Sequence, residues 1–527
     1  MGERNGATAW VVALLALALL IRLPRVLAND FPLNDGGIFY VMAGELAGAR
    51  LTLPSFTSYN NVRIPFAYPP LAIATAAAIN LATGADLLTV QRFLPLLASL
   101  VAVAVFFLLA RRLAGSIARA SLATLLFVVL PRSYEWLIMG GGLTRSFGFV
   151  FLLLTLLFGH RLMAGRERRA SLPAALFLGL TVLSHPEMGL LAAAGVGVLT
   201  VAAGIDRWKS ARAAEVAVGA VVMTAPWWAT VIARHGLAPF TGAAGSSGFW
   251  LRGAVARLAS GDVTGEVGFP VIASLATLGF LLSLWRRDLV VPGWLVAAFV
   301  LVPRAAATPA TVPLALLATL GLTDIVVPGM ASALGSSVPP SGGGLGPPRR
   351  FGGADTGART LRILMAGLAV AYPLAFSNAL RTTREWASMA VLSRPERAAM
   401  AWVASNAPAA SRFLLVSTAS PWWVDPVDSW FPALTGRESV TSPNGAEWLP
   451  RGEFQRRESE YFALKACRVV DDACLEAWSR RFNEEFTHVY VSKPTVAGAQ
   501  PVPLCDSPRF RVVFDGAGAT VLQRHQP

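Results

Sequence analysis

Long apolar runs alternate with short polar segments along residues 1–380 of the chain. A helix that crosses a bilayer needs about 20 mainly apolar residues, and such runs are the main sequence signal for spanning helices. The pattern therefore predicts a polytopic α-helical membrane protein with about 11 transmembrane helices. The candidate spans are residues 8–28, 93–110, 118–138, 146–163, 173–184, 187–204, 214–233, 268–285, 289–303, 309–327 and 360–380.

The pattern changes near Arg394, where charged residues and tryptophans become frequent. Short strand-like segments and flanking helical patterns there indicate a small α/β domain of ordinary size. We therefore expect a transmembrane domain over residues 1–380 and a soluble α/β domain over 381–527. The predicted strands are 413–416, 489–491 and 511–514, and the predicted helices are 395–405 and 471–486.

Composition strengthens the membrane assignment. Hydrophobic residues make up 54% of the chain and charged residues only 14%, whereas soluble domains contain about 25% charged residues. The formal net charge is +14, but the arginines form short clusters between apolar runs rather than one basic face, so we predict no nucleic-acid partner. The first run ends at Leu23-Pro24-Arg25 without a small-residue cleavage site, which favours an uncleaved helix over a signal peptide.

The basic clusters also predict orientation, because Lys and Arg in short loops are retained on the cytoplasmic side. With a cytoplasmic N-terminus, every cluster falls on that side, provided that residues 71–83 form a helix at the outer interface and do not cross. The first loop, 29–92, and the domain 381–527 are then extracytoplasmic, and the Gly-, Ser- and Pro-rich segment 328–359 is a flexible cytoplasmic loop. We therefore predict a multi-pass protein of the plasma membrane. The clusters are Arg111-Arg112, 161–169, 207–212, 286–287 and 349–362.

Three cysteines, Cys467, Cys474 and Cys505, all lie in the predicted soluble domain. An extracytoplasmic location favours one disulfide among them, with three unpaired thiols as the alternative. The spacing does not decide which pair would close.

Candidate chemistry begins in the first loop, with Asn34-Asp35-Gly36-Gly37 and, further along, Tyr68-Pro69-Pro70-Leu71. A carboxylate just beyond the first membrane helix is placed to deprotonate an acceptor hydroxyl, which is the work of a general base with a raised pKa. The alternative is that Asp35 is a turn or helix N-cap residue, because Asp-Gly favours both.

The order of first membrane helix, Asp-Gly, Tyr40 and Ala43, and then Tyr-Pro-Pro-Leu resembles the GT-C superfamily of membrane glycosyltransferases, in particular its protein-mannosyltransferase-like and aminoarabinose-transferase-like members. The resemblance implies a multi-helix fold, an active site on the outer face and polyprenyl-phosphate-linked sugar donors. It also implies that Asp35 takes the place of the catalytic carboxylate of the first loop.

The chain departs from this pattern at a second acid, since many GT-C members have Asp-Glu where this chain has Asp35-Gly36. Glu45 and Glu135 are the candidates for that acid. Metal-dependent relatives hold a divalent cation with acids from several outer loops, and Asp35 with Glu135 would be the pair for Mg²⁺ or Mn²⁺. Oxygen ligands are otherwise scarce, so we predict no metal site.

Two further residues are candidates for binding the donor phosphate. His185 lies in Ser184-His185-Pro186-Glu187, which interrupts two apolar runs where some relatives have a break facing the phosphate. Arg304 follows an apolar run in Val302-Pro303-Arg304 and resembles the outer-facing arginine of the family. The alternatives are a neutral packing histidine and an arginine that anchors the helix end at the interface. Arg132 and Arg145 allow the same two interpretations as Arg304.

The sequence contains no phosphate-binding loop, dinucleotide fingerprint or His-Glu-x-x-His motif. We therefore predict an inverting GT-C glycosyltransferase that takes a sugar from a polyprenyl phosphate and passes it to a glycan, lipid or protein hydroxyl. Its partners would be that donor, the acceptor and membrane lipids. The alternatives are a multi-span transporter or lipid flippase, for which we find no related halves, and a non-catalytic GT-C relative, which the missing second acid would support.

Overall fold

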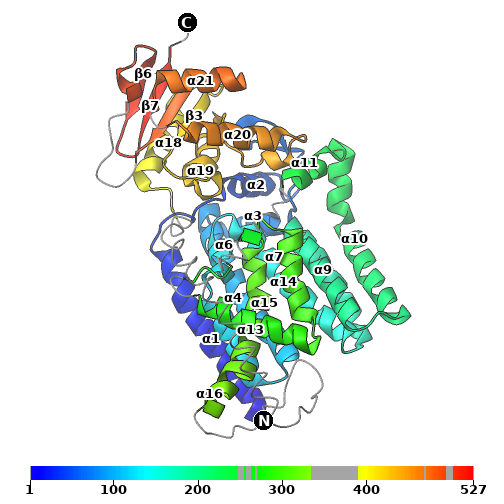
Figure 1. Cartoon of the computed structure of the whole chain (residues 1–527). Coiled ribbons are helices and arrows are strands. Elements are labelled where there is room, and N and C mark those ends of the chain that lie inside the picture. The colour runs from blue at the N-terminus through cyan, green and yellow to red at the C-terminus, as the bar shows by residue number, and fades with distance from the viewer. Residues whose placement is uncertain are drawn as a thin grey trace.

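The computed structural model describes residues 2–246, 255–256, 263–266, 270–333, 390–467, 470–493 and 503–525. A helical bundle carries the N-terminus at one end and a C-terminal sheet domain at the other (Figure 1). The predicted span at 360–380 and residues 334–359 of the predicted cytoplasmic loop lie outside the described residues.

The bundle forms where the apolar runs predicted helices. α4 shows how the ends are set: the Asp86 side chain accepts a hydrogen bond from Thr89 N at the start, and Gly115 in the left-handed region ends the helix. The bundle elements are α1 (Gly2–Leu27), α4 (Leu87–Ala114), α5 (Ile117–Val129), η2 (Pro131–Ser133), α6 (Glu135–Ile138), α7 (Gly142–Met163), η3 (Arg168–Ala170), α8 (Ser171–Val182), α9 (Pro186–Ala202), α10 (Arg207–His235), α13 (Val271–Arg286), α14 (Val290–Leu301), α15 (Ala307–Gly321), η4 (Leu322–Val326) and α16 (Val327–Ala333).

The prediction of about 11 spans is not confirmed. Within the described residues, five helices are long and apolar enough to cross a membrane, or six if the pair Ile117–Val129 and Pro131–Ile138, bent by 92°, counts as one span. α8 and α14 have 12 residues each, and at about 1.5 Å per residue such a helix is shorter than the roughly 30 Å hydrocarbon core. The protein is thus a multi-pass membrane protein in which several apolar helices are too short for a straight crossing.

Short elements lie between the bundle and the sheet domain. α2 runs crosswise beneath the C-terminal domain, with α3 below it (Figure 1). The helix predicted at 71–83 is confirmed as α3, while its place at the outer interface stays a prediction. The elements of this layer are α2 (Gly37–Gly48), β1 (Phe56–Thr57), η1 (Tyr59–Asn61), β2 (Ile64–Pro65), α3 (Leu71–Thr83) and α11 (Ala238–Ser246).

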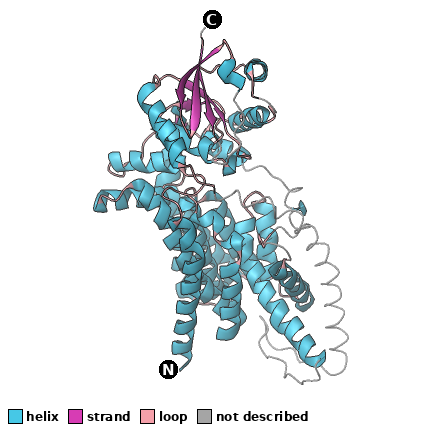
Figure 2. Ribbon diagram, turned by 90° about the vertical axis from the view of Figure 1, so that its left-hand side faces the viewer, coloured by secondary structure: helices cyan, strands magenta, loops and turns pink. Residues whose placement is uncertain are grey.

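The C-terminal domain contains a five-stranded sheet in the order β4-β3-β5-β7-β6, which lies at the end of the molecule away from the N-terminus (Figure 2). β3 pairs in parallel with β4 and β5, whereas β7 is antiparallel to β5 and β6. The domain elements are α18 (Arg394–Asn406), β3 (Arg412–Val416), η6 (Trp422–Val424), α19 (Pro426–Thr435), β4 (Glu438–Ser439), η7 (Ala446–Trp448), α20 (Glu453–Lys465), α21 (Asp472–Phe482), β5 (His488–Ser492), η8 (Pro503–Asp506), β6 (Phe510–Asp515) and β7 (Ala519–Arg524).

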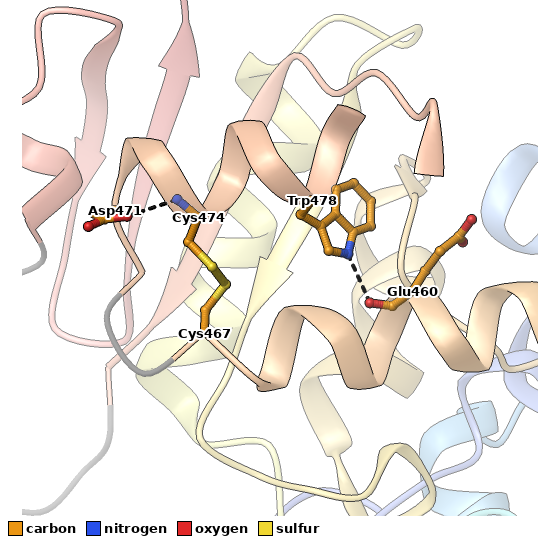
Figure 3. The surroundings of a disulfide bond; sticks show 5 residues. All are labelled: Glu460, Cys467, Asp471, Cys474 and Trp478. Atoms are coloured by element: carbon orange, nitrogen blue, oxygen red, sulfur yellow. Dashed lines mark hydrogen bonds between the residues drawn. A yellow bond between two sulfur atoms is a disulfide. The ribbon is translucent and has the colours of Figure 1, made fainter. Parts of the chain in front are cut away.

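The structure decides the cysteine pairing that the sequence left open. Cys467 and Cys474 form a disulfide with their Cα atoms 6.2 Å apart (Figure 3). Cys505 is free and exposed. The disulfide links the end of α20 to the start of α21. A hydrogen bond of 2.9 Å from Trp478 Nε1 to Glu460 O also joins these two helices. Two links of different kinds thus hold this helix pair together.

The C-terminal domain packs directly on the first loop of the membrane domain. The backbone at Asn34 accepts a hydrogen bond from Trp430 Nε1 at 2.9 Å, and the Trp430 ring lies 4.6 Å from the ring of Phe31. Tyr59 donates its hydroxyl to Ser429 O at 2.8 Å. Trp430 and Tyr59 are fully buried, so the loop and the domain share one packed interface.

Candidate active site

Asp35 lies in this first loop, held against the turn before α7. Gly141 N donates a hydrogen bond of 3.0 Å to Asp35 Oδ1. A Cβ on Gly141 would lie 2.6 Å from Asp35 Cγ, far inside van der Waals contact, so only glycine allows this approach. α2 begins after Gly36, with no side-chain cap, so Asp35 does not act as its N-cap.

Gln91 of α4 joins the two backbone segments that hold Asp35. Its Nε2 donates hydrogen bonds to Gly36 O at 2.8 Å and to Gly140 O at 3.1 Å. Gly140 N donates in turn to Leu33 O at 2.8 Å. The carboxylate is therefore fixed by backbone on both sides.

The electrostatic setting of Asp35 suits a base. Burial raises the pKa of Asp35, while the Arg145 guanidinium and the Gly141 N–H lower it by smaller amounts. A carboxylate with a raised pKa takes up a proton more readily than an ordinary aspartate.

Arg145 is the arginine that the structure brings to Asp35. It lies in the first turn of α7, where its NH1 donates to Trp136 O at 2.9 Å and its guanidinium stacks 5.2 Å from the Trp136 ring centre. Its positive charge acts on Asp35, on His185 and on Tyr68. The sequence left Arg145 open to the same two interpretations as Arg304, a phosphate-binding arginine or an interfacial anchor.

His185 occupies the break between α8 and α9, as the N-terminal flanking residue of α9. It is buried, and among the described residues its Nδ1 has no hydrogen-bond partner. Leu71 N, at the start of α3, donates a hydrogen bond of 2.9 Å to Leu183 O at the same break. The charges of Arg145 and Arg304 both act on the ring. Burial and two nearby cations favour the neutral imidazole, so His185 is suited to donate a hydrogen bond and not to supply a charge.

Arg304 lies in the turn between α14 and α15 and is exposed. Its NH1 is 3.4 Å from Ser246 O, at the end of α11. Its charge acts on His185 and also on Glu447 of the C-terminal domain. The positive charges of two arginines therefore act on His185: Arg145 from α7 and Arg304 from this turn.

The two candidates for a second acid lie in different settings. Glu45 Oε1 accepts hydrogen bonds from Ser58 N at 2.6 Å and Ser58 Oγ at 2.7 Å, which holds the loop after β1 against α2. Glu135 begins α6, where its charge acts on Tyr134. Glu45 thus stabilises the loop at Ser58. Neither the Glu45–Ser58 hydrogen bonds nor the effect of Glu135 on Tyr134 links these acids to Asp35.

Sequence reasoning missed Tyr68 and Glu447 as members of this cluster. The Tyr68 hydroxyl lies 3.1 Å from Thr144 Oγ1, one residue before Arg145, and its ring packs 5.5 Å from that of Trp448. The charges of Arg145 and Glu447 both act on Tyr68. The Tyr-Pro-Pro-Leu motif had marked the position of Tyr68, whereas no sequence signal placed residue 447 near residue 68.

Among the described residues, no group of three or more His, Cys, Asp or Glu side chains is arranged to hold a metal ion.

Comparison with known proteins identifies the fold. Residues 67–255 match a family model described as a 6-pyruvoyl-tetrahydropterin synthase related domain, membrane protein. No curated protein matches the chain.

Solved structures match over nearly the whole chain. The archaeal oligosaccharyltransferase AglB from Archaeoglobus fulgidus, in complex with an inhibitory peptide and a dolichol-phosphate, has a TM-score of 0.52 and 14% identity over 93% of this chain and 70% of that one. Arabinofuranosyltransferase AftD from Mycobacteria has a TM-score of 0.50 and 15% identity over 99% of this chain and 40% of that one. ArnT from Cupriavidus metallidurans has a TM-score of 0.49 and 15% identity over 98% of both chains. The chain thus has the fold of the GT-C membrane glycosyltransferases.

Proposed function

We propose that this chain, which has the GT-C fold, is a membrane glycosyltransferase that moves a sugar from a polyprenyl-phosphate donor to a hydroxyl of a glycan, lipid or protein acceptor. One observation carries the proposal: a partly buried carboxylate with a raised pKa, Asp35, is held by the Gly141 N–H, and the charge of Arg145 acts on both Asp35 and His185. Sugar transfer of this kind needs a base to deprotonate the acceptor hydroxyl and positive charge to stabilise the leaving phosphate. The dolichol-phosphate bound to AglB supports a polyprenyl-phosphate donor.

The proposed reaction is a single displacement. Asp35 accepts the proton of the acceptor hydroxyl while the hydroxyl oxygen bonds to C1 of the sugar. The bond from C1 to the phosphate oxygen breaks, its electron pair stays on that oxygen, and polyprenyl phosphate leaves. Because the acceptor attacks from the face opposite the leaving group, the configuration at C1 inverts.

The leaving phosphate gains negative charge as the bond breaks, so cations and hydrogen-bond donors that face it lower the barrier. Arg145 and Arg304 are the proposed cations, and a guanidinium can bind a phosphate with two parallel hydrogen bonds. His185 is proposed to donate a hydrogen bond as a neutral imidazole. These roles need no nucleotide.

The proposed orientation places the N-terminus in the cytoplasm and the C-terminal domain outside. The opposite positions of these two parts along the bundle support it (Figure 1). The ion pair of Arg166 with Asp206 links the basic cluster 161–169 to the residue that precedes the cluster 207–212, and both clusters are proposed to face the cytoplasm. The site at Asp35 would then open toward the outer leaflet.

The test is sugar transfer by the purified protein in liposomes that contain a polyprenyl-phosphate sugar. Asp35→Asn should abolish transfer while leaving the thermal unfolding temperature close to wild type, because the amide keeps the shape and loses the base. Asp86→Asn is the matched control, since Asp86 caps α4 and asparagine caps a helix equally well. Retained transfer by Asp35→Asn would overturn the base assignment, and movement of the lipid across the bilayer without transfer would favour a flippase.

A further inference from the structure

A turn of the C-terminal domain lies against the membrane-domain site. Gly445 has a φ of +86°, and a Cβ there would lie 2.7 Å from Ile64 Cδ1 and 2.9 Å from Ile38 Cδ1. Trp448, three residues on, is buried against the Tyr68 ring. The turn 443–448 is therefore packed on α2, β2 and the loop before α3, and its approach requires glycine at position 445.

The turn is also held from within its own domain. Asp428 of α19 is buried and accepts hydrogen bonds from Ser442 Oγ at 3.0 Å and from Asn444 Nδ2 at 3.1 Å. Ala446 N donates to Pro443 O at 3.0 Å, and Trp448 N donates to Gly445 O. The buried Asp428 side chain, with two side-chain donors, thus fixes the backbone that carries Glu447.

α11 joins this turn to the arginine of the site. A Cβ on Gly242 of α11 would lie 3.0 Å from Glu447 O, so this helix packs closely on the turn. Gln455 of α20 also donates a hydrogen bond of 3.0 Å from its Nε2 to Gly245 O of α11. At the end of the same helix, Ser246 O accepts from Arg304 NH1. One nine-residue helix therefore contacts both the Glu447 turn and the Arg304 side chain.

The charges agree with this arrangement. Burial raises the pKa of Glu447, and the Arg304 guanidinium lowers it, so the two side chains attract one another. The Glu447 charge also acts on Tyr68, which hydrogen-bonds to Thr144 beside Arg145. Within the part of the chain that the structure describes, Arg304 makes one hydrogen bond, to a backbone oxygen at 3.4 Å, and this bond uses one of its five guanidinium donors.

We propose that Glu447 of the C-terminal domain is the second acid of this site and acts as a positioning residue that orients the Arg304 guanidinium toward the donor phosphate. The proposal rests on the proposed function. In this proposal Glu447 takes the role of second acid for which the sequence had offered Glu45 and Glu135. Glu447 was not a candidate because it lies far from Asp35 in the sequence. It also gives the C-terminal domain a part in donor binding, because the site lacks its second acid until that domain is seated.

A double-mutant cycle with transfer kinetics in liposomes tests the proposal. Glu447→Gln should raise KM for the polyprenyl-phosphate sugar about tenfold with a smaller change in kcat, because Arg304 loses its orientation and Asp35 is untouched. In an Arg304→Gln background, Glu447→Gln should change KM less than about twofold, since residues that act as a unit are not additive. Glu447→Asp should restore part of the affinity.

Glu485→Gln is the matched control, because Glu485 is exposed on the same domain, and it should leave KM unchanged. Wild-type KM for Glu447→Gln, or equal effects in both backgrounds, would overturn the proposal while the proposed function stands. Absence of transfer by the wild-type protein would instead defeat the proposed function. If Glu447→Gln lowers the unfolding temperature, binding of polyprenyl phosphate below that temperature gives the same comparison.

Discussion

Gly141→Ala tests whether catalysis depends on the position of the Asp35 carboxylate. The new methyl carbon would lie 2.6 Å from Asp35 Cγ, whereas ordinary contact begins near 3.4 Å, so the carboxylate must move by nearly 1 Å. The movement also breaks the 3.0 Å hydrogen bond from Gly141 N to Asp35 Oδ1. A hydrogen bond to a charged group contributes about 1.5–3 kcal/mol, and a misplacement of about 1 Å can cost about 100-fold in rate.

We therefore expect kcat for sugar transfer to fall about 100-fold, which corresponds to about 2.7 kcal/mol of transition-state stabilisation. The acidic limb of the pH profile should also move to higher pH. Asp35 works as a base when deprotonated, and the Gly141 N–H lowers the pKa of Asp35, so losing this donor raises that pKa further.

The assay is steady-state transfer in liposomes across pH, with the thermal unfolding temperature measured in parallel. Gly48→Ala is the matched control, because a Cβ at Gly48 of α2 meets nothing within 4 Å, and it should keep wild-type kcat. Wild-type kcat with an unshifted acidic limb in a folded Gly141→Ala protein would refute the reasoning.

Three further predictions concern the C-terminal domain. Burial and the Asp425 carboxylate raise the pKa of Asp428, so the folded state binds this proton more tightly than the unfolded chain. Stability should then fall as pH rises from the ordinary aspartate range toward the raised pKa; Asp428→Asn should flatten this slope in thermal unfolding, and an unchanged slope would contradict the assignment. The seven-residue separation of Cys467 and Cys474 predicts that reduction costs about 2 kcal/mol of stability, while a membrane-impermeant maleimide should label Cys505 in intact cells; labelling only after lysis would reverse the proposed orientation.

The sequence predicted three of the five strands of the C-terminal sheet and missed β4 and β7. The strands expected at 413–416, 489–491 and 511–514 lie in β3, β5 and β6, and the helix expected at 71–83 is α3. β4 was missed because it has only two residues, Glu438 and Ser439, and these form a strand through their pairing with Arg412 and Phe413 of β3. The number of spans was not settled, because apolar composition alone does not say whether a helix as short as α8 or α14, with 12 residues each, crosses the bilayer.

The candidate site was predictable only in part, for a similar reason. Asp35 and His185 carried local signals, an acid after the first helix and a polar break between apolar runs. Arg145 gains its importance from the close approach of Gly141 to Asp35, which is 106 residues away in sequence. Glu45 looked suitable by distance along the chain, but its carboxylate binds Ser58. Glu447 depends on domain packing, which no periodicity reveals.

The seating of the C-terminal domain on the first loop has a consequence for the order of synthesis. Phe31 and Tyr59 are made early, yet the Trp430 and Ser429 that cover or bind them are made some 370 to 400 residues later. A ribosome-bound chain therefore carries an uncovered aromatic surface until α19 has been translated. A product truncated before residue 426 would leave that surface uncovered.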